Sequence, residues 1–493
     1  MANFHRLLVP SFDVAWCALS EDDQVALIAG GGGSFKSGVK NQIQIARVYD
    51  GDKVTFMDSY ITDMESNRRL CCGLACGTIG EHSVVVALLD SDCVILALEM
   101  NADSSSVVSF TQKADFRADF ATEDSSLNCC LVTRTGLVVT GGEDHICRVW
   151  RIDGDLSLGS TPWKVTLSAA LLGHDGPVMA LSFHPSEQWL CTAAKDGSCK
   201  IWDAEAAAVA DRKSKQSQVS GTNSSPRVDE EKDDAGKEAA AAAAAAAAIS
   251  AALMVCDVPC NVDGVTGTGS ASAAAVLSPL NGKAGGPTMQ CRGCCFSTCG
   301  QFLYSIQSGK RGPTHLIQWS LRRKNIAAGT SDTSAAGSAK EKAKNTIDAA
   351  ALECIPVKMV VAAPVPCTSL QLDLTGDFLA VGSSEGRVVC FSTQHHLRQL
   401  ASFACHDLPV TGMGFAPPNL AHSLGMKAVI TTCSADRKLA VLKVGGYSVC
   451  FKITMLLVLL MVLIILALYS TSLWLLLAEK NIIQPTGDVH LEL

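Results

Sequence analysis

A glycine-rich segment near the N-terminus has the composition of a loop that binds a ligand or a partner. It reads Gly30-Gly31-Gly32-Gly33-Ser34-Phe35-Lys36-Ser37-Gly38-Val39-Lys40-Asn41 and joins two apolar runs, QVALIA and QIQIARV, that are typical of β-strands. A hairpin needs two to five connecting residues, whereas this one uses twelve. Five glycines allow the backbone to turn several carbonyl or amide groups toward one point. We call residues 30–41 the glycine loop.

Two other readings of the glycine loop are open. A phosphate cradle of the form G-x-x-x-x-G-K-[ST] almost fits from Gly30 to Ser37, but Phe35 replaces its second glycine and a strand follows instead of a helix. Nucleotide binding by this chain is therefore disfavoured. The second reading is a long hairpin with no binding role.

Cysteines and a histidine–aspartate pair elsewhere could also do chemistry. Cys291, Cys294, Cys295 and Cys299 have zinc-like C-x-x-C spacing, but no second pair follows at the spacing of a zinc ribbon. The same segment alternates as a strand and a turn. A structural role is favoured for these cysteines.

Repeats of about 40 residues must position these groups. The clearest unit, residues 172–203, begins with Gly173-His174, continues as PVMALSF, QWLCTAA and SCKIWD, and ends at Ile201-Trp202-Asp203. It is identified as a WD-repeat blade of four strands. His174, Asp196 and Trp202 stand where such blades have a structural hydrogen-bond network, so catalysis by this pair is disfavoured.

Six further segments follow the same pattern, with Asp144 and Trp150 at corresponding places in the preceding unit. The sequence therefore predicts an all-β fold, a seven-bladed WD-repeat β-propeller over residues 1–445. Residues 4–9 are expected to supply the outer strand of the last blade. Residues 204–288 and 324–346, rich in Ala, Gly, Ser and Thr, are expected to be disordered insertions after blades 4 and 5.

Composition excludes several classes of function. The net charge of -8 arises from 40 Lys and Arg against 48 Asp and Glu, so no basic field attracts nucleic acid. The first residues lack the apolar core of a signal peptide, so the 22 cysteines predict a reducing compartment and not a disulfide framework.

A C-terminal apolar segment predicts membrane attachment. Residues 453–478 carry no charge over 26 positions, which exceeds the roughly 20 that span a bilayer. Lys452, Lys443, Lys438 and Arg437 precede the segment and only Lys480 follows it, so the propeller is expected in the cytosol and residues 479–493 in the lumen. The ending His490-Leu491-Glu492-Leu493 resembles the retrieval signal of the endoplasmic reticulum, with a mismatch at Leu491.

The whole arrangement resembles a known family, the guanine nucleotide exchange factors for the Sar-type small GTPase, which start COPII coat assembly at the endoplasmic reticulum. The prolactin regulatory element-binding protein of animals is a relative. The glycine loop carries the resemblance most specifically, because its four glycines, Lys36, Gly38 and Asn41 stand where the family's loop has them.

The resemblance implies a function and a set of site residues. Asn41 and Lys36 would face the GTPase, and a potassium ion would be held mainly by backbone oxygens of Gly30, Gly31, Gly32, Gly33, Ser34, Gly38 and Asn41. The expected partners are a Sar-type GTPase, the endoplasmic-reticulum membrane and further COPII-associated proteins, with no nucleic acid. No covalent chemistry is implied. The alternative is a membrane-tethered propeller scaffold without exchange activity.

Overall fold

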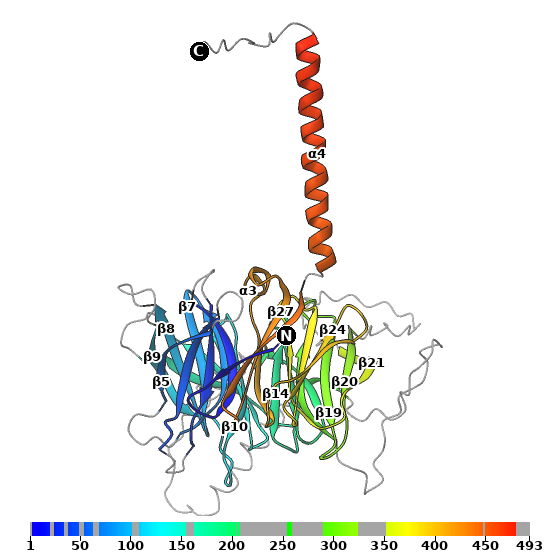
Figure 1. Cartoon of the computed structure of the whole chain (residues 1–493). Helices are drawn as coiled ribbons and strands as arrows, with labels where there is room; N and C mark the ends of the chain where they lie inside the picture. The colour runs from blue at the N-terminus through cyan, green and yellow to red at the C-terminus, as the bar shows by residue number, and fades with distance from the viewer. Residues whose placement is uncertain are drawn as a thin grey trace, which may run out of the picture.

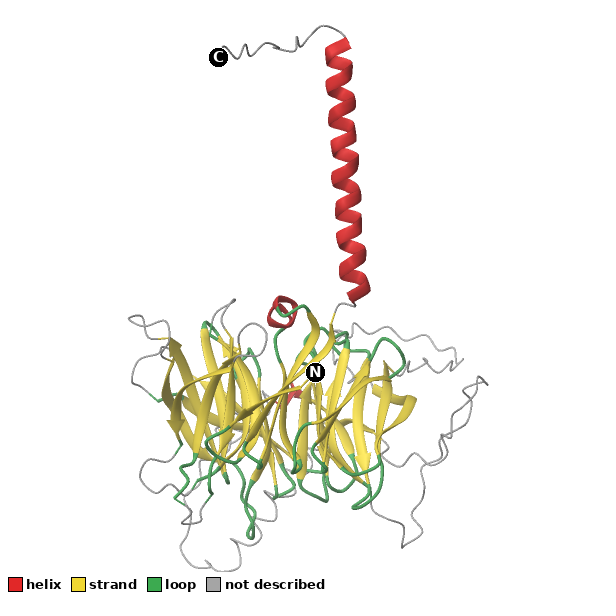
Figure 2. Cartoon of the chain, in the orientation of Figure 1, coloured by secondary structure: helices red, strands yellow, loops and turns green. Residues whose placement is uncertain are grey.

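The structure is a computed structural model, and it describes residues 2–19, 24–33, 38–48, 54–62, 69–100, 108–153, 162–204, 206–207, 254–258, 289–323, 352–446 and 449–479. Seven antiparallel sheets of four strands each form the blades of a propeller (Figures 1 and 2). The sequence prediction of a seven-bladed β-propeller is confirmed.

The strands of each blade follow one another in sequence. The first four blades, from the inner strand outward, are β2(Ser11–Ala18), β3(Gln24–Gly30), β4(Gln42–Val48) and β5(Val54–Ile61); β6(Cys71–Ile79), β7(His82–Leu89), β8(Asp92–Met100) and β9(Val108–Arg117); β10(Leu127–Val132), β11(Leu137–Gly142), β12(Cys147–Asp153) and β13(Lys164–Leu171); β14(Val178–Phe183), β15(Trp189–Ala194), β16(Cys199–Asp203) and β17(Met254–Val258). The last three are β18(Gln290–Phe296), β19(Phe302–Ser308), β20(Thr314–Arg323) and β21(Leu352–Ala363); β22(Cys367–Leu372), β23(Phe378–Ser383), β24(Arg387–Ser392) and β25(Arg398–Ala404); β26(Val410–Phe415), β27(Met426–Ser434), β28(Lys438–Gly446) and β1(Ala2–Arg6).

The ring closes through the N-terminal strand. β1 pairs antiparallel with β28, from Ala2 opposite Leu442 to Arg6 opposite Lys438. The strand begins two residues before the predicted segment 4–9 and ends at Arg6. Its pairing ties the two ends of the propeller together, so blade 7 contains strands from both ends of the chain.

The core lies between neighbouring blades. The middle strands are apolar over most of their length, because each blade is covered on both faces by its neighbours; in β7, for example, Val84 to Leu89 are all buried. Leu27 and Ile43 of blade 1 pack in one cluster with Val85 and Leu96 of blade 2. Stability therefore depends on adjacent blades together, as in other repeat proteins.

A β-bulge at the start of every inner strand gives the seven blades a common reference. The pairing with the second strand shifts by one residue at the pairs Ser11/Asp13, Cys71/Gly73, Leu127/Cys129, Val178/Ala180, Cys291/Gly293, Cys367/Ser369 and Val410/Gly412. Positions in different blades can therefore be compared residue by residue.

The propeller has two faces with different connections. β2 and β26 run side by side in the same direction, because Thr411 Oγ1 donates to Ser11 O at 2.8 Å while a Cβ on Gly414 would lie 3.3 Å from Trp16 Cδ1. The starts of the inner strands and the glycine loop thus share one face, which we call the loop face. The ends of the inner strands share the opposite face with helix α3 (Pro418–Ser423).

The C-terminal helix α4 (Val449–Glu479) begins on the face that bears α3, which we call the helix face. Gly446, at the end of β28, pairs with Met426 directly after α3. Figure 1 shows α4 standing clear of the propeller. Its described side chains, residues 457–473 and Leu476, are all exposed. Within the part of the chain that the structure describes, no helix meets the length and hydropathy required of a membrane span.

The first insertion differs from the expectation of a wholly disordered segment. Residues 254–258 within it form β17, which pairs with β16 and completes blade 4, and Ala204 and Ala207 are buried. The alternating run MVCDV gives the blade the outer strand that it otherwise lacks. The remainder of that insertion, and residues 324–346, lie outside the described residues apart from Ala206.

Candidate functional site

The glycine loop is the exception among seven equivalent connections. The link between the second and third strands contains two to five residues in blades 2 to 7 but eleven, residues 31–41, in blade 1. Gly30 itself ends β3, so the connection is one residue shorter than the sequence indicated. Because the other six blades close with short turns, the propeller fold does not require this length.

Two of the glycines are required by close packing. A Cβ on Gly30 would lie 2.3 Å from Pro10 O, and a Cβ on Gly31 would lie 2.1 Å from Asn41 Oδ1 and 2.6 Å from Asn41 Cα. Gly31 N also donates to Pro10 O at 3.0 Å. The start of the loop is therefore pressed between the connection that precedes β2 and the Asn41 side chain.

Asn41 holds the loop from inside the protein. Its Oδ1 accepts from Gly33 N at 3.0 Å and its Nδ2 donates to Gly33 O at 3.3 Å, while its own carbonyl accepts from Thr62 N at 3.1 Å. The residue is 0% exposed. The side chain thus fixes the first turn of the loop against β4 and β5.

This placement revises the expectation for Asn41. The resemblance implies that its amide faces the GTPase, but the amide is buried and engaged with Gly33. Asn41 is therefore placed to position the loop, and the exposed part of the described loop is Gly38 and Lys40. Lys36 and Ser34 lie outside the described residues.

The oxygen atoms of the glycine loop are of the kind that binds a monovalent cation. Gly33 and Gly38 both have φ of +71°, a conformation open to glycine that turns neighbouring peptide groups away from a strand direction. Residues 30–41 contain no carboxylate, so the loop offers only neutral oxygens. Divalent cations prefer carboxylates, whereas potassium is held by carbonyl oxygens. Gly33 O, bonded to Asn41, keeps one lone pair for a further ligand.

The His174 network is structural, as the sequence indicated. His174 Nδ1 lies 3.2 Å from Asp196 Oδ2, His174 Nε2 lies 2.7 Å from Thr192 Oγ1, and Trp202 Nε1 donates to Thr192 Oγ1 at 2.8 Å. Burial opposes ionisation of Asp196, but hydrogen bonds from His174 and Ser198 outweigh it and lower the pKa of this carboxyl group. The network ties the turn before β16 to the segment before β14.

Sequence reasoning missed a second network of the same kind in blade 7. His406 Nδ1 lies 3.2 Å from Asp436 Oδ2, and His406 Nε2 lies 2.9 Å from Thr432 Oγ1. The signal was the run His406-Asp407-Leu408-Pro409, which repeats His174-Asp175-Gly176-Pro177 with one change. In blade 3 the arrangement differs, because Asp144 pairs with Arg148 at 2.6 Å.

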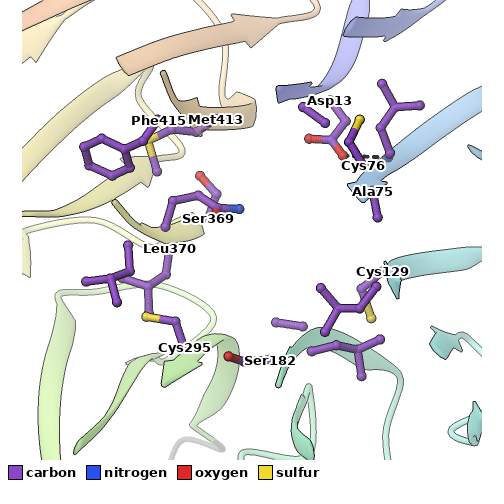
Figure 3. Close-up of a pocket in the computed structure, with 18 of the residues that line it drawn as sticks. Asp13, Ala75, Cys76, Cys129, Ser182, Cys295, Ser369, Leu370, Met413 and Phe415 are labelled. Atoms are coloured by element: carbon purple, nitrogen blue, oxygen red, sulfur yellow. Dashed lines mark hydrogen bonds between the residues drawn. The ribbon is translucent and has the colours of Figure 1, made fainter. Parts of the chain in front are cut away.

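The central channel is a second candidate, with a cavity of about 820 Å³ along the inner strands. Figure 3 shows Asp13, Cys129, Cys295 and Met413 around its open centre. Burial raises the pKa of Cys129 and Cys295, so these thiols stay neutral and are poor nucleophiles. The channel therefore has no activated thiol at these positions.

Asp13 is one of two aspartates, with Asp373, that line the channel. Its Oδ2 accepts from Leu74 N and its Oδ1 from Val14 N, both at 2.8 Å, so it joins blades 1 and 2. Burial raises the pKa of this carboxyl group to about 7, although both N–H groups act in the opposite direction. These contacts account for Asp13 as a structural residue at the bulge of β2.

The four cysteines with C-x-x-C spacing, Cys291, Cys294, Cys295 and Cys299, lie along β18 and in the turn that follows it. Cys291 Sγ lies 3.2 Å from Cys199 Sγ, and Cys294 Sγ donates to Cys191 O at 3.8 Å. Among the described residues, no group of three His, Cys, Asp or Glu side chains is arranged to hold a metal ion. Cys291 and Cys294 are buried in the apolar cluster that joins blades 4 and 5.

Comparison with known proteins supports the fold. Residues 165–203 match the family model "WD domain, G-beta repeat". No curated protein matches the chain. Among solved structures, Sqt1 from Chaetomium thermophilum has 15% identity and a TM-score of 0.49, covering 90% of this chain and 85% of its own. Sqt1 of the same organism bound to the N-terminus of the ribosomal protein L10 has 14% identity and a TM-score of 0.50, covering 88% and 97%. Residues 165–203 therefore form a WD repeat, and the seven sheets of the structure form a seven-bladed propeller.

Proposed function

We propose that this propeller is a guanine nucleotide exchange factor for a Sar-type small GTPase at the endoplasmic-reticulum membrane. A WD-repeat propeller is a platform for binding other proteins, and the proposal assigns its loop face to the GTPase. The observation that carries the proposal is the glycine loop, because it makes the connection between β3 and β4 eleven residues long where the other blades have two to five. Its first turn is fixed by the buried Asn41 side chain.

A fixed loop suits exchange because exchange needs no covalent chemistry. A partner that binds the nucleotide-free GTPase more tightly than the GDP-bound form shifts the population toward GDP release. A loop that is already ordered loses little conformational entropy when it docks, so more of its interaction energy is available for that preference. The hydrogen bonds between Asn41 and Gly33 supply such order at the first turn of the loop in the free protein.

Potassium is part of the proposal. Main-chain oxygens of Gly31, Gly32, Gly33 and Gly38, with Ser34 and Gly30 beside them, would hold the ion. When bound, it would draw several carbonyl oxygens together and stiffen the part of the loop beyond Gly33. The absence of carboxylates in residues 30–41 supports a monovalent ion.

Membrane attachment through α4 is also proposed. The large apolar side chains described from Leu457 to Leu476 are 46% to 70% exposed, and an apolar surface of this extent requires a lipid or protein cover. In sealed microsomes, added protease should digest the propeller and spare residues 479–493. Protection of the propeller would contradict the proposed cytosolic orientation.

The tail ending in His490 to Leu493 is proposed to act as a retrieval signal in the lumen.

This attachment would give the loop face a definite orientation. Because α4 begins on the helix face, the glycine loop lies on the side of the propeller away from the start of the helix. The strand ends that flank residues 208–253 and 324–351 belong to the helix face as well. The loop face carries none of these segments, so we assign the binding of the GTPase to it.

The alternative is a tethered scaffold without exchange activity, and it requires only the fold. An exchange assay separates the two: the full-length chain in detergent micelles is added to a Sar-type GTPase loaded with fluorescent GDP. Acceleration of GDP release supports the proposal. Stable binding of the GTPase with an unchanged rate of GDP release would favour the scaffold.

A further inference from the structure

Blade 1 lacks the polar clamp that secures the equivalent segment of blades 4 and 7. In those blades, the Asp175 and Asp407 backbone N–H groups donate to Asp196 Oδ2 and Asp436 Oδ2, at 2.9 and 3.0 Å. The clamp ties the segment before the inner strand to the turn between the second and third strands. His174 and His406 lie beside it in the two networks described above.

The common bulge identifies the corresponding residues of blade 1. Gly31 N donates to Pro10 O, as Lys195 N donates to Pro177 O in blade 4. Val14 pairs with Ile28, as Leu181 pairs with Thr192 and Met413 with Thr432. Counting from these pairs, the equivalents of His174, Asp175, Thr192 and Asp196 are Leu7, Leu8, Ile28 and Gly32.

Apolar packing replaces the network in blade 1. Leu7 is 2% exposed and packs in one cluster with Ile28, where blades 4 and 7 place a histidine against a threonine. Gly32 stands where Asp196 and Asp436 accept the clamp hydrogen bond. The change removes the clamp from the turn, which in this blade is the long glycine loop.

Among the residues that replace the polar network in blade 1, Leu8 is the one that the fold does not explain. Its side chain is 75% exposed, although the segment around it is held firmly: Leu7 N donates to Arg437 O at 2.8 Å, and Val9 is 5% exposed. The same position is an exposed aspartate in blades 4 and 7. Blade 1 thus has an exposed leucine on a fixed backbone, two residues from the proline that touches Gly31, where blades 4 and 7 have a charged residue.

We infer that Leu8 is an apolar anchor for the GTPase, docking beside the glycine loop on the loop face. The inference rests on the proposed exchange function and extends its contact surface. Leu8 directly precedes Val9 and Pro10, which pack against Gly30 and Gly31, so its exposed side chain lies on the same face as the start of the glycine loop. Arg437 is also exposed, and its carbonyl accepts from the N–H of Leu7, the neighbour of Leu8. The surface of the GTPase that meets Leu8 is therefore expected to be apolar.

Leu8→Asp tests the anchor with little risk to folding, because it restores the residue that blades 4 and 7 carry at this position. Leu8→Met keeps an apolar side chain of similar size. Leu374→Asp is the matched control, since Leu374 is 70% exposed but lies in a turn on the helix face. Each full-length variant is compared with the wild type in GDP release from a Sar-type GTPase, with circular dichroism for folding.

The expected result for Leu8→Asp is a catalytic efficiency about tenfold or more below that of the wild type, from loss of one buried leucine contact. Leu8→Met and Leu374→Asp should retain wild-type efficiency. If Leu8→Asp unfolds, Leu8→Ala replaces it and should show a loss in the same direction. Wild-type efficiency in the folded Leu8 variants would overturn the anchor while leaving the exchange function intact. If the wild-type chain itself fails to accelerate GDP release from the GTPase, the proposed function is wrong. The GTPase is then also wrong as the docking partner of Leu8.

Discussion

The side chain of Asn41 satisfies both polar groups of Gly33, accepting from its N–H at 3.0 Å and donating to its carbonyl at 3.3 Å. The pair closes the first turn of a loop that is longer than the equivalent connection of each of the other six blades. Asn41 is fully buried and Gly33 is half-buried, so the interaction lies at the edge of the protein interior. The Asn41 side chain therefore fixes the first turn of the loop, together with the hydrogen bond from Gly31 N to Pro10 O.

Asn41→Ala should lower the stability of the blade 1 loop by about 1–3 kcal/mol, because it leaves the N–H of Gly33 without its buried acceptor. The propeller should stay folded, since no large apolar side chain is removed. Thermal unfolding followed by circular dichroism measures the change. Asn419→Ala, at an exposed position in α3, is the control and should shift the midpoint much less. Equal midpoints for the two variants would show that the bonds to Gly33 are not stabilising.

Gly31→Ala and Gly33→Ala should differ in their effect on GDP release. A Cβ on Gly31 would lie 2.1 Å from Asn41 Oδ1 and must displace the side chain that orders the loop. A Cβ on Gly33 meets nothing within 4 Å, so the variant has only the strain of positive φ, about 1–2 kcal/mol. Labelled-nucleotide release should therefore slow far more for Gly31→Ala. The reverse order would mean that the contact with Asn41 is not what the loop requires.

Replacing potassium by sodium should slow exchange several-fold if backbone oxygens of the glycine loop hold the ion. Sodium is smaller, so the loop would have to contract to keep the same oxygens as ligands. The comparison uses chloride salts at equal ionic strength, which keeps general screening constant. GDP release by the GTPase alone in each salt is the control. Identical acceleration in the two salts would argue against a potassium site.

The contribution of Asp13 to stability should decrease as the pH rises from about 4 to about 7. Burial raises the pKa of this carboxyl group from 3.8 to about 7, so in this window the folded protein holds a proton that the unfolded chain has released. Compared with Asp13→Asn, the wild type should therefore lose thermal stability between about pH 4 and pH 7. A difference in midpoint that stays constant with pH would mean that Asp13 titrates at its ordinary value.

The sequence predicted the ring of blades because the repeating pattern is regular even where the WD signature is weak. It missed the His406–Asp436 network, since Cys405 replaces the glycine before the histidine and Leu442 stands where blade 4 has Trp202. It also missed β17, a five-residue strand enclosed by low-complexity sequence.

The glycine loop could be located from its composition, but the role of Asn41 could not. The residue type predicts hydrogen bonding to a carbonyl or to a partner, and only the fold decides between them by burying the side chain against Gly31 and Gly33. The exposure of Leu8 could not be predicted from the sequence either. Its equivalence with Asp175 and Asp407 follows from the positions of the β-bulges, which only the structure shows.

The most direct test of the proposed function is the rate of GDP release from a Sar-type GTPase in the presence of the full-length protein and of its Asn41→Ala variant, both in potassium buffer. The proposal predicts strong acceleration by the wild type and little by the variant, with circular dichroism showing that both propellers are folded. Equal acceleration by the two proteins would contradict a role for the ordered glycine loop. No acceleration by the wild type would leave the tethered scaffold as the better description.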